Sequence, residues 1–203
     1  MNITKIFAVL LVFATVSFAN LGFKEGDNEF GTGFLAGWGY GDGYGVPFVW
    51  DRGAFGGMFS FGGELRMWWT NYWGWVDGYS VYDEDNNHVY PWWVDGYRKK
   101  LTRFGWAPMF RFMYHPFGMP TLKGQVKVAK SLDPYVGMKF GFSVINYSKD
   151  DQYYNVPGRD RRYVDFPVFN LVWGGLRWYF TENVSLWSEA SIYDFSLGLN
   201  FKF

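Results

Sequence analysis

The last residues of the chain alternate strictly between large apolar side chains and small or polar ones. The residues in between are a serine, a glycine, an asparagine and a lysine. Because successive side chains of a β-strand point to opposite faces, this pattern predicts a strand with one continuous apolar face. That face consists of Phe195, Leu197, Leu199, Phe201 and Phe203.

The same alternation recurs upstream in segments of about ten residues, long enough for a tilted strand to cross a bilayer. The count is eight, and single-chain bacterial barrels have an even number of strands. The sequence therefore predicts an all-β fold, an eight-stranded antiparallel up-and-down transmembrane β-barrel. A soluble, exported β-sandwich is the alternative fold. The expected strands cover about 29–39, 46–55, 58–70, 101–114, 134–146, 167–180, 183–192 and 195–203.

The composition fits a barrel and excludes several other classes of protein. Aromatic residues make up 24% of the chain, as expected if aromatic girdles lie at both membrane interfaces. Lys and Arg total 19, as do Asp and Glu, so there is no basic field for nucleic acid. The chain has no cysteine, and its two histidines, His88 and His115, lie far apart. We therefore expect no disulfide, no metal site and no cofactor.

The start of the chain reads as a cleaved signal peptide. Lys5 precedes an apolar stretch over 6–16, which is too short to span a bilayer as a helix. Ala19 supplies the small residue that a signal peptidase requires. We expect a signal peptide over 1–19, a barrel domain over 20–203, and export to the outer membrane. An even strand count leaves both ends periplasmic, which makes the connections at about 40–45, 71–100 and 147–166 extracellular.

Several motifs of this chain resemble those of small outer-membrane β-barrel domain proteins, the opacity-like eight-stranded barrels. The motifs are at 114–116, 133–137, 173–183, 186–190 and 195–203. The resemblance implies a Gram-negative-type outer membrane, with the terminal apolar face as the signal for barrel assembly. It implies as partners the assembly machinery and the lipid and lipopolysaccharide of that membrane. The family has no shared catalytic residues, so the resemblance implies no active site.

The strand pattern places a set of charged side chains inside the barrel. A small barrel has an interior that side chains can fill, and buried charges must be paired. The simplest interpretation is a salt-bridged plug, and the alternatives are a narrow polar conduit or a proton-handling carboxylate cluster. The set consists of Asp51, Glu64, Arg66, Arg103, Arg111, Lys139, Arg177 and Glu189.

The segment at 71–100 carries a repeated Trp-Val-Asp-Gly-Tyr motif on either side of an acidic stretch at 83–88. One interpretation is a hairpin that extends the third and fourth strands above the membrane. The other is a binding patch for sugars or a protein partner, because Trp and Tyr give large contact areas. Calcium at the acidic stretch is a weaker hypothesis, because the spacing fits no EF-hand. The candidate binding residues are Trp73, Trp75, Asp77, Tyr79, Trp92, Trp93, Asp95 and Tyr97.

These observations favour a non-enzymatic, porin-like protein of the cell surface, with a structural or surface-interaction role. One alternative is a narrow channel for small solutes. Another is a lipid-modifying enzyme with a Ser-His-acid set. Neither histidine lies within a few residues of a serine, and no Gly-x-Ser-x-Gly motif occurs. We therefore expect no enzymatic activity. The basic run at 159–162 is either a contact for lipopolysaccharide or a solvated surface run.

Overall fold

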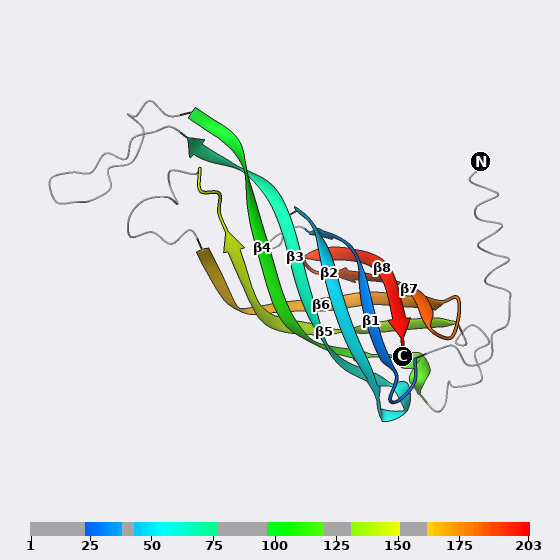
Figure 1. The fold of residues 1–203 in the computed structure, drawn as a ribbon. Helices are drawn as coiled ribbons and strands as arrows, with labels where there is room; N and C mark the ends of the chain where they lie inside the picture. Colours follow the sequence, from blue (N-terminus) through cyan, green and yellow to red (C-terminus); the bar gives the residue numbers. More distant parts are fainter. Residues whose placement is uncertain (1–22, 38–42, 77–96, 120–130, 151–161) are drawn as a thin grey trace, which may run out of the picture.

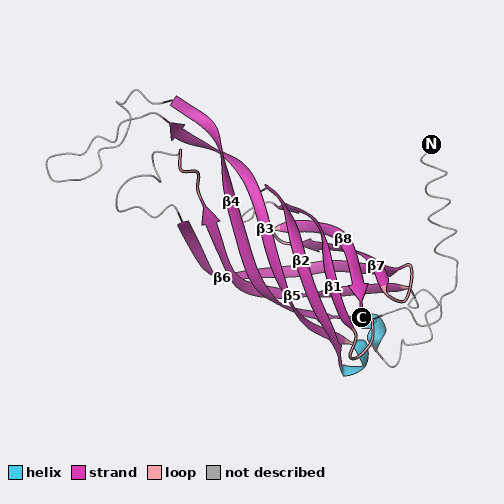
Figure 2. Cartoon of the chain, viewed as in Figure 1, coloured by secondary structure: helices cyan, strands magenta, loops and turns pink. Residues whose placement is uncertain are grey.

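The computed structural model is a closed barrel of eight antiparallel strands, each paired with its neighbours in the chain (Figures 1 and 2). The structure describes residues 23–37, 43–76, 97–119, 131–150 and 162–203. The predicted fold class is confirmed. The strands are β1 (Asn28–Gly37), β2 (Gly43–Ala54), β3 (Phe59–Val76), β4 (Tyr97–Tyr114), β5 (Leu132–Asn146), β6 (Arg162–Tyr179), β7 (Val184–Ser191) and β8 (Asp194–Lys202).

The barrel has two distinct ends. We call the end that carries the β1–β2, β3–β4, β5–β6 and β7–β8 connections the loop end, and the opposite end the turn end. Two short 3-10 turns, η1 (Phe55–Gly57) and η2 (Pro116–Gly118), lie at the turn end after β2 and β4. No described helix is long and apolar enough to span a membrane. The predicted signal peptide at 1–19 lies outside the described residues.

The closing seam between β1 and β8 follows the alternation predicted from the sequence. Nine residue pairs join the two strands, from Glu29 opposite Lys202 to Gly37 opposite Asp194. On β8, Phe195, Leu197, Leu199 and Phe201 are each 40–47% exposed on the outer face, whereas the residues between them face the lumen. The outer face is therefore apolar and the inner face polar, as lipid and lumen require.

Four of the five predicted outward positions of β5 are exposed, and the fifth, Val144, is covered. Val136, Met138, Phe140 and Phe142 are exposed, but Val144 is only 4% exposed. Val144 lies between Trp106 and Val164 in register, just beyond an irregularity in the β5–β6 pairing. Because Ser143 and Ile145 on either side of it face the lumen, alternation still directs Val144 outward, and its low exposure means that neighbouring side chains cover it.

The strands differ greatly in length, so the loop end is uneven. β3, β4 and β6 each have 18 residues, whereas β7 has eight and β8 has nine. The β3–β4 hairpin consequently rises beyond the β7–β8 hairpin in Figure 1. Its ladder continues to the pair formed by Val76 and Tyr97, so the strands enter the segment expected to be loop. β2 and β6 likewise begin inside the expected loops at 40–45 and 147–166.

Apolar side chains close the lumen on both sides of its polar centre. Toward the loop end, Trp68 packs in a buried cluster, and a Cβ on Gly105 would lie only 2.4 Å from the Trp68 ring. Toward the turn end, Phe23 from the segment before β1 packs against Tyr179. The loop-end cluster consists of Leu35, Trp68, Ala107, Met109, Ile145 and Val168.

Candidate functional site in the barrel lumen

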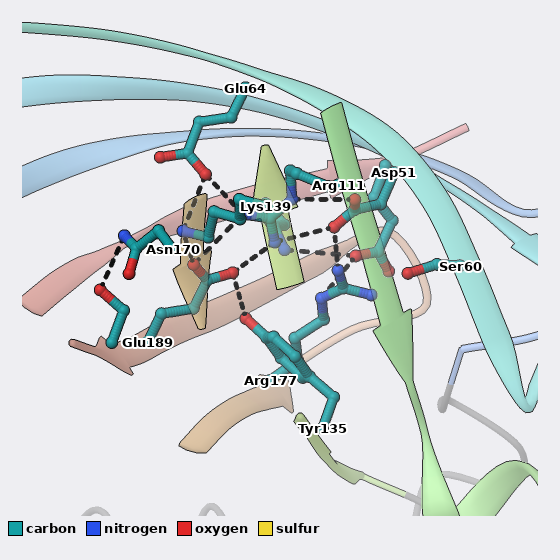
Figure 3. A network of polar contacts seen from close by, with 12 residues as sticks. Asp51, Ser60, Glu64, Arg111, Tyr135, Lys139, Asn170, Arg177 and Glu189 are labelled. Carbon is teal, nitrogen blue, oxygen red and sulfur yellow. Dashed lines mark hydrogen bonds and ion pairs between the residues drawn. The ribbon is translucent and has the colours of Figure 1, made fainter. Parts of the chain in front are cut away.

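The centre of the lumen is a continuous network of ion pairs, and Arg111 is its hub (Figure 3). From β4, its guanidinium donates to Asp51 of β2 at 3.1 Å and to Glu64 of β3 at 2.6 Å. It also donates to Glu189 of β7, on the opposite wall. One side chain therefore ties four strands together across the barrel.

Lys139 of β5 lies beside this hub. Its ammonium group pairs with Glu64 at 2.9 Å and also with Glu189. The Tyr135 hydroxyl donates to Glu189 at 3.0 Å, so this carboxylate receives hydrogen bonds from three side chains. Such saturation is what a buried carboxylate requires, because each unmade hydrogen bond carries a desolvation cost.

Arg66 carries the network toward the loop end. It pairs with Glu64 on its own strand and reaches Asp194 at the start of β8, where Nη2 donates at 3.1 Å. Asn170 of β6 donates to the same Asp194 carboxylate at 2.7 Å. Asp194 is thus fixed from two walls of the barrel.

Arg177 carries the network toward the turn end. It pairs with Asp51 and lies 3.4 Å from Glu29 of β1. Its guanidinium also lies over the rings of Phe23 and Tyr135, at 4.7 and 4.9 Å from the centroids. Favourable contacts with aromatic faces are expected of an arginine whose charge is removed from water.

The carboxylates of this network outnumber its lysine and arginine cations by six to four among the described residues. All these side chains are almost completely buried. Loss of one partner would leave an uncompensated buried charge, so the network is stable only when complete. The arrangement places buried charges of both signs in contact through the centre of the lumen.

The structure brings together seven of the eight predicted lumen residues. The exception is Arg103, which is half-buried nearer the loop end and lies over the Tyr147 ring at 5.9 Å. Sequence reasoning missed Glu29, Asp133 and Asp194. Glu29 begins the expected strand at 29–39, and Asp133 and Asp194 each precede an expected strand by one residue. All three are in phase with the inward positions that follow, so applying the alternation to the strand ends would have found them.

A second polar chain lies at the turn end and was also missed. The Ser60 hydroxyl is 2.9 Å from Nε2 of His115, and Nδ1 of His115 is 2.9 and 3.0 Å from the two oxygens of Asp133. Ser60 precedes His115 by 55 residues, but β3 and β4 are adjacent, and Ser60 pairs with Met113. The separation of the serines and histidines along the sequence therefore does not reveal this contact, which strand pairing creates.

The lumen also contains a small pocket of about 30 Å³ near the loop end. Trp68 Nε1, Ser143 Oγ and Asn170 Oδ1 belong to residues that line it, and none of these atoms has a hydrogen-bond partner in the described structure. A pocket of this size with several polar atoms fits an ordered water molecule. We call it the lumen pocket.

The predicted binding residues of the β3–β4 hairpin are described only in part. Trp73 is 62% exposed on the outer face, opposite Lys100. Trp75 pairs with Arg98 and Val76 with Tyr97 in the ladder. The remaining candidates, Asp77, Tyr79, Trp92, Trp93 and Asp95, lie outside the described residues. Within the described ranges, no group of three or more His, Asp or Glu side chains could hold a metal ion.

Comparisons with known proteins identify similar folds at low sequence identity. No family model matches the sequence, and no curated protein matches it. OprG of Pseudomonas aeruginosa aligns at 14% identity and a TM-score of 0.48, over 90% of this chain and 98% of that one. The N-terminal β-barrel domain of OprF, from the same organism, aligns at 16% and 0.45, over 89% and 99%. Ail, the attachment invasion locus protein of Yersinia pestis, aligns at 10% and 0.42, over 88% and 99%.

These structures are small eight-stranded outer-membrane barrels, the class that the sequence motifs resemble. In this chain, the strands follow one another in sequence order, β1 and β8 close the barrel, and the outer face is apolar. In architecture, the chain is a closed, eight-stranded antiparallel β-barrel with an apolar outer face.

Proposed function

We propose that this chain is a non-enzymatic outer-membrane β-barrel protein with a plugged lumen, which acts through its extracellular hairpins. The observation that carries the proposal is that side chains fill the lumen while the strands extend to unequal lengths at the loop end. The barrel interior supplies stability, and the extended β3–β4 hairpin supplies a surface.

The plugged lumen is supported by three layers of side chains along the barrel axis. The apolar cluster around Trp68 lies toward the loop end, the ion-pair network lies in the middle, and Phe23 with Tyr179 lies toward the turn end. An ion or solute crossing the lumen would have to displace paired buried charges, which costs several kcal/mol per charge. The alternative, a narrow solute channel, requires these layers to open.

The surface role is supported by the outer face of the β3–β4 hairpin. Trp69 and Phe104 are exposed where the strands leave the barrel, and Trp73 and Lys100 lie opposite each other further out. Exposed Trp side chains suit sugar faces and protein partners because they give large contact area at low entropic cost. The same side chains suit the lipid interface, where aromatic girdles form.

The proposed location is the outer membrane, reached through a signal peptide that is cleaved after Ala19. The apolar belt around the barrel supports insertion in a bilayer, and the assembly machinery would act on the terminal apolar face of β8. Mass spectrometry of the protein from the membrane fraction tests the cleavage. A mature chain that begins at Asn20 is the expected result.

Two measurements test the proposed function. In planar bilayers, the purified barrel is expected to give no stable conductance steps; regular steps would establish the channel alternative.

For the surface role, residues 73–100 are replaced by an Asn-Gly turn, which joins the paired residues Tyr72 and Leu101. The shortened barrel should keep its heat-modifiable gel shift and lose binding to an immobilised glycan array. If the full-length and shortened barrels bind glycans equally, or if neither binds, the hairpin is not the binding surface.

A further inference from the structure

The arrangement of Ser60, His115 and Asp133 has the connectivity of a base-activated serine. Both oxygens of Asp133 lie within 3.0 Å of Nδ1 of His115, which assigns the imidazole proton to that nitrogen. Nε2 then accepts a hydrogen bond from the Ser60 hydroxyl at 2.9 Å. This is the relation of nucleophile, base and orienting carboxylate that activates a serine.

The imidazole ring is held firmly in this orientation. Phe23 stacks on one side with ring centroids 5.0 Å apart and an interplanar angle of 29°. Tyr135 lies at 5.3 Å and 35°. Asp133 is placed in turn by Arg177, whose Nη1 lies 3.8 Å from the carboxylate. Because rotation of the ring is restricted, Nε2 stays directed at Ser60 without any substrate present.

The chain of three residues is buried, and a short segment before β1 places Phe23 over the imidazole. Ser60 and His115 are both 0% exposed. Residues 23–27 form a strap over the turn end, and Gly26 donates to the Gly53 carbonyl at 3.0 Å. The strap holds Phe23 against the imidazole mainly through main-chain hydrogen bonds at its other residues. Loss of the Phe23 ring would therefore open His115 while the strap keeps its anchors.

We propose that Ser60 is a masked nucleophile, a covalent modification site for small acyl or phosphonyl electrophiles that becomes accessible when the Phe23 ring is absent or displaced. This goes beyond the proposed function, which uses the outer hairpins and requires no chemistry at the turn end. The site would take one acyl or phosphonyl group per barrel.

The chemistry balances without any further reagent. The Ser60 hydroxyl transfers its proton to Nε2 of His115 as its oxygen forms a bond to the carbonyl carbon or phosphorus of the electrophile. The bond from that atom to the leaving group breaks, and the leaving group departs with its electron pair and accepts the proton from Nε2. The product is an ester on Ser60, and Asp133 stabilises the imidazolium that forms in between.

The test uses an alkyl fluorophosphonate on the full barrel in detergent micelles, with intact-mass measurement and peptide mapping. Phe23→Ala should react at Ser60 alone, at least about tenfold faster than the wild-type barrel, with loss of fluoride. Adding Ser60→Ala should abolish the adduct, and adding Asp133→Asn should slow it at least about tenfold. Ser196→Ala in the same background is the matched control. Ser196 is a buried lumen serine whose hydroxyl has no hydrogen-bond partner in the described structure. Its replacement should leave the rate and the site of adduct formation unchanged.

Heat-modifiability of each variant on a gel verifies that the barrel is closed, and Phe23→Val replaces Phe23→Ala if the latter does not fold. A closed Phe23 variant that forms no adduct would overturn the proposal, because Ser60 would then be only a structural hydrogen-bond donor. An adduct that also forms after Ser60→Ala, or that is indifferent to Asp133→Asn, would overturn it as well.

Discussion

Replacement of Arg111 by methionine tests whether the lumen network stabilises the barrel as a unit. The side chain is fully buried and donates to three carboxylates, those of Asp51, Glu64 and Glu189. Methionine keeps much of the volume but leaves these carboxylates with fewer cations. Removal of one partner from a buried ion-pair network typically costs about 3–5 kcal/mol. We expect the free energy of unfolding to fall by this amount.

The assay is reversible urea unfolding in lipid vesicles, followed by tryptophan fluorescence and by the gel shift of the closed barrel. With a denaturant slope of about 1–3 kcal/mol/M, the expected loss moves the midpoint by at least about 1 M. Arg103→Met is the matched control, because Arg103 also faces inward but has no ion pair in the described structure. Its expected cost is below about 1 kcal/mol.

A double-mutant cycle shows whether the cost comes from stranded carboxylates. Adding Glu189→Gln to Arg111→Met removes one of the carboxylates that the first change leaves short of a partner. The pair of changes should therefore cost less than the sum of the single changes, by about 0.5–3 kcal/mol. If Arg111→Met costs no more than Arg103→Met, or if the two changes simply add, the network is not a cooperative unit.

Three further predictions concern packing, lipid contact and buried water. Gly105→Ala should destabilise the barrel by about 1–3 kcal/mol in the same unfolding assay and shift the fluorescence emission of Trp68. Gly63→Ala is the control and should be nearly neutral, because the nearest atom to a new Cβ there is 3.9 Å away. Phe140→Arg on the apolar outer belt should lower the free energy of unfolding in vesicles by about 2–4 kcal/mol, and Trp73→Arg on the projecting hairpin by less than about 1 kcal/mol. Equal losses would contradict the assignment of Phe140 to the lipid-facing belt. A crystal structure at high resolution should contain an ordered water in the lumen pocket, hydrogen-bonded to the Trp68 indole, and an empty pocket would refute this.

The sequence predicts the wall of this barrel better than its interior. Alternation decides which face a residue occupies, so inward Arg111 and outward Phe140 are both assigned correctly by their phase along the strand. Alternation does not say which inward residues meet across the lumen. The contact of Arg66 with Asp194 joins residues 128 positions apart, and it depends on closure and on the stagger of all the strands between them.

The Ser60–His115–Asp133 chain was missed for a related reason. Catalytic-type sets are often sought through local motifs, but here the serine lies on β3, the histidine directly follows the last residue of β4, and the aspartate is the second residue of β5. The β3–β4 pairing alone places Ser60 beside the end of β4. A search that combined inward phase with strand order would therefore have found the serine and the histidine, although not the angle of the imidazole ring.

The lumen network also explains how one closed register is selected over its neighbours. A slip of β8 against β1 by one residue would turn Asp194 and Asn200 toward lipid, so the apolar face alone excludes odd slips. A slip by two residues keeps every face correct, and the belt cannot exclude it. It would move Asp194 by about 6.7 Å along the strand, out of reach of Arg66, and would break the hydrogen bond from Asn200 to Glu29. The outer belt thus sets the face of the closing strand, and the buried ion pairs set its position.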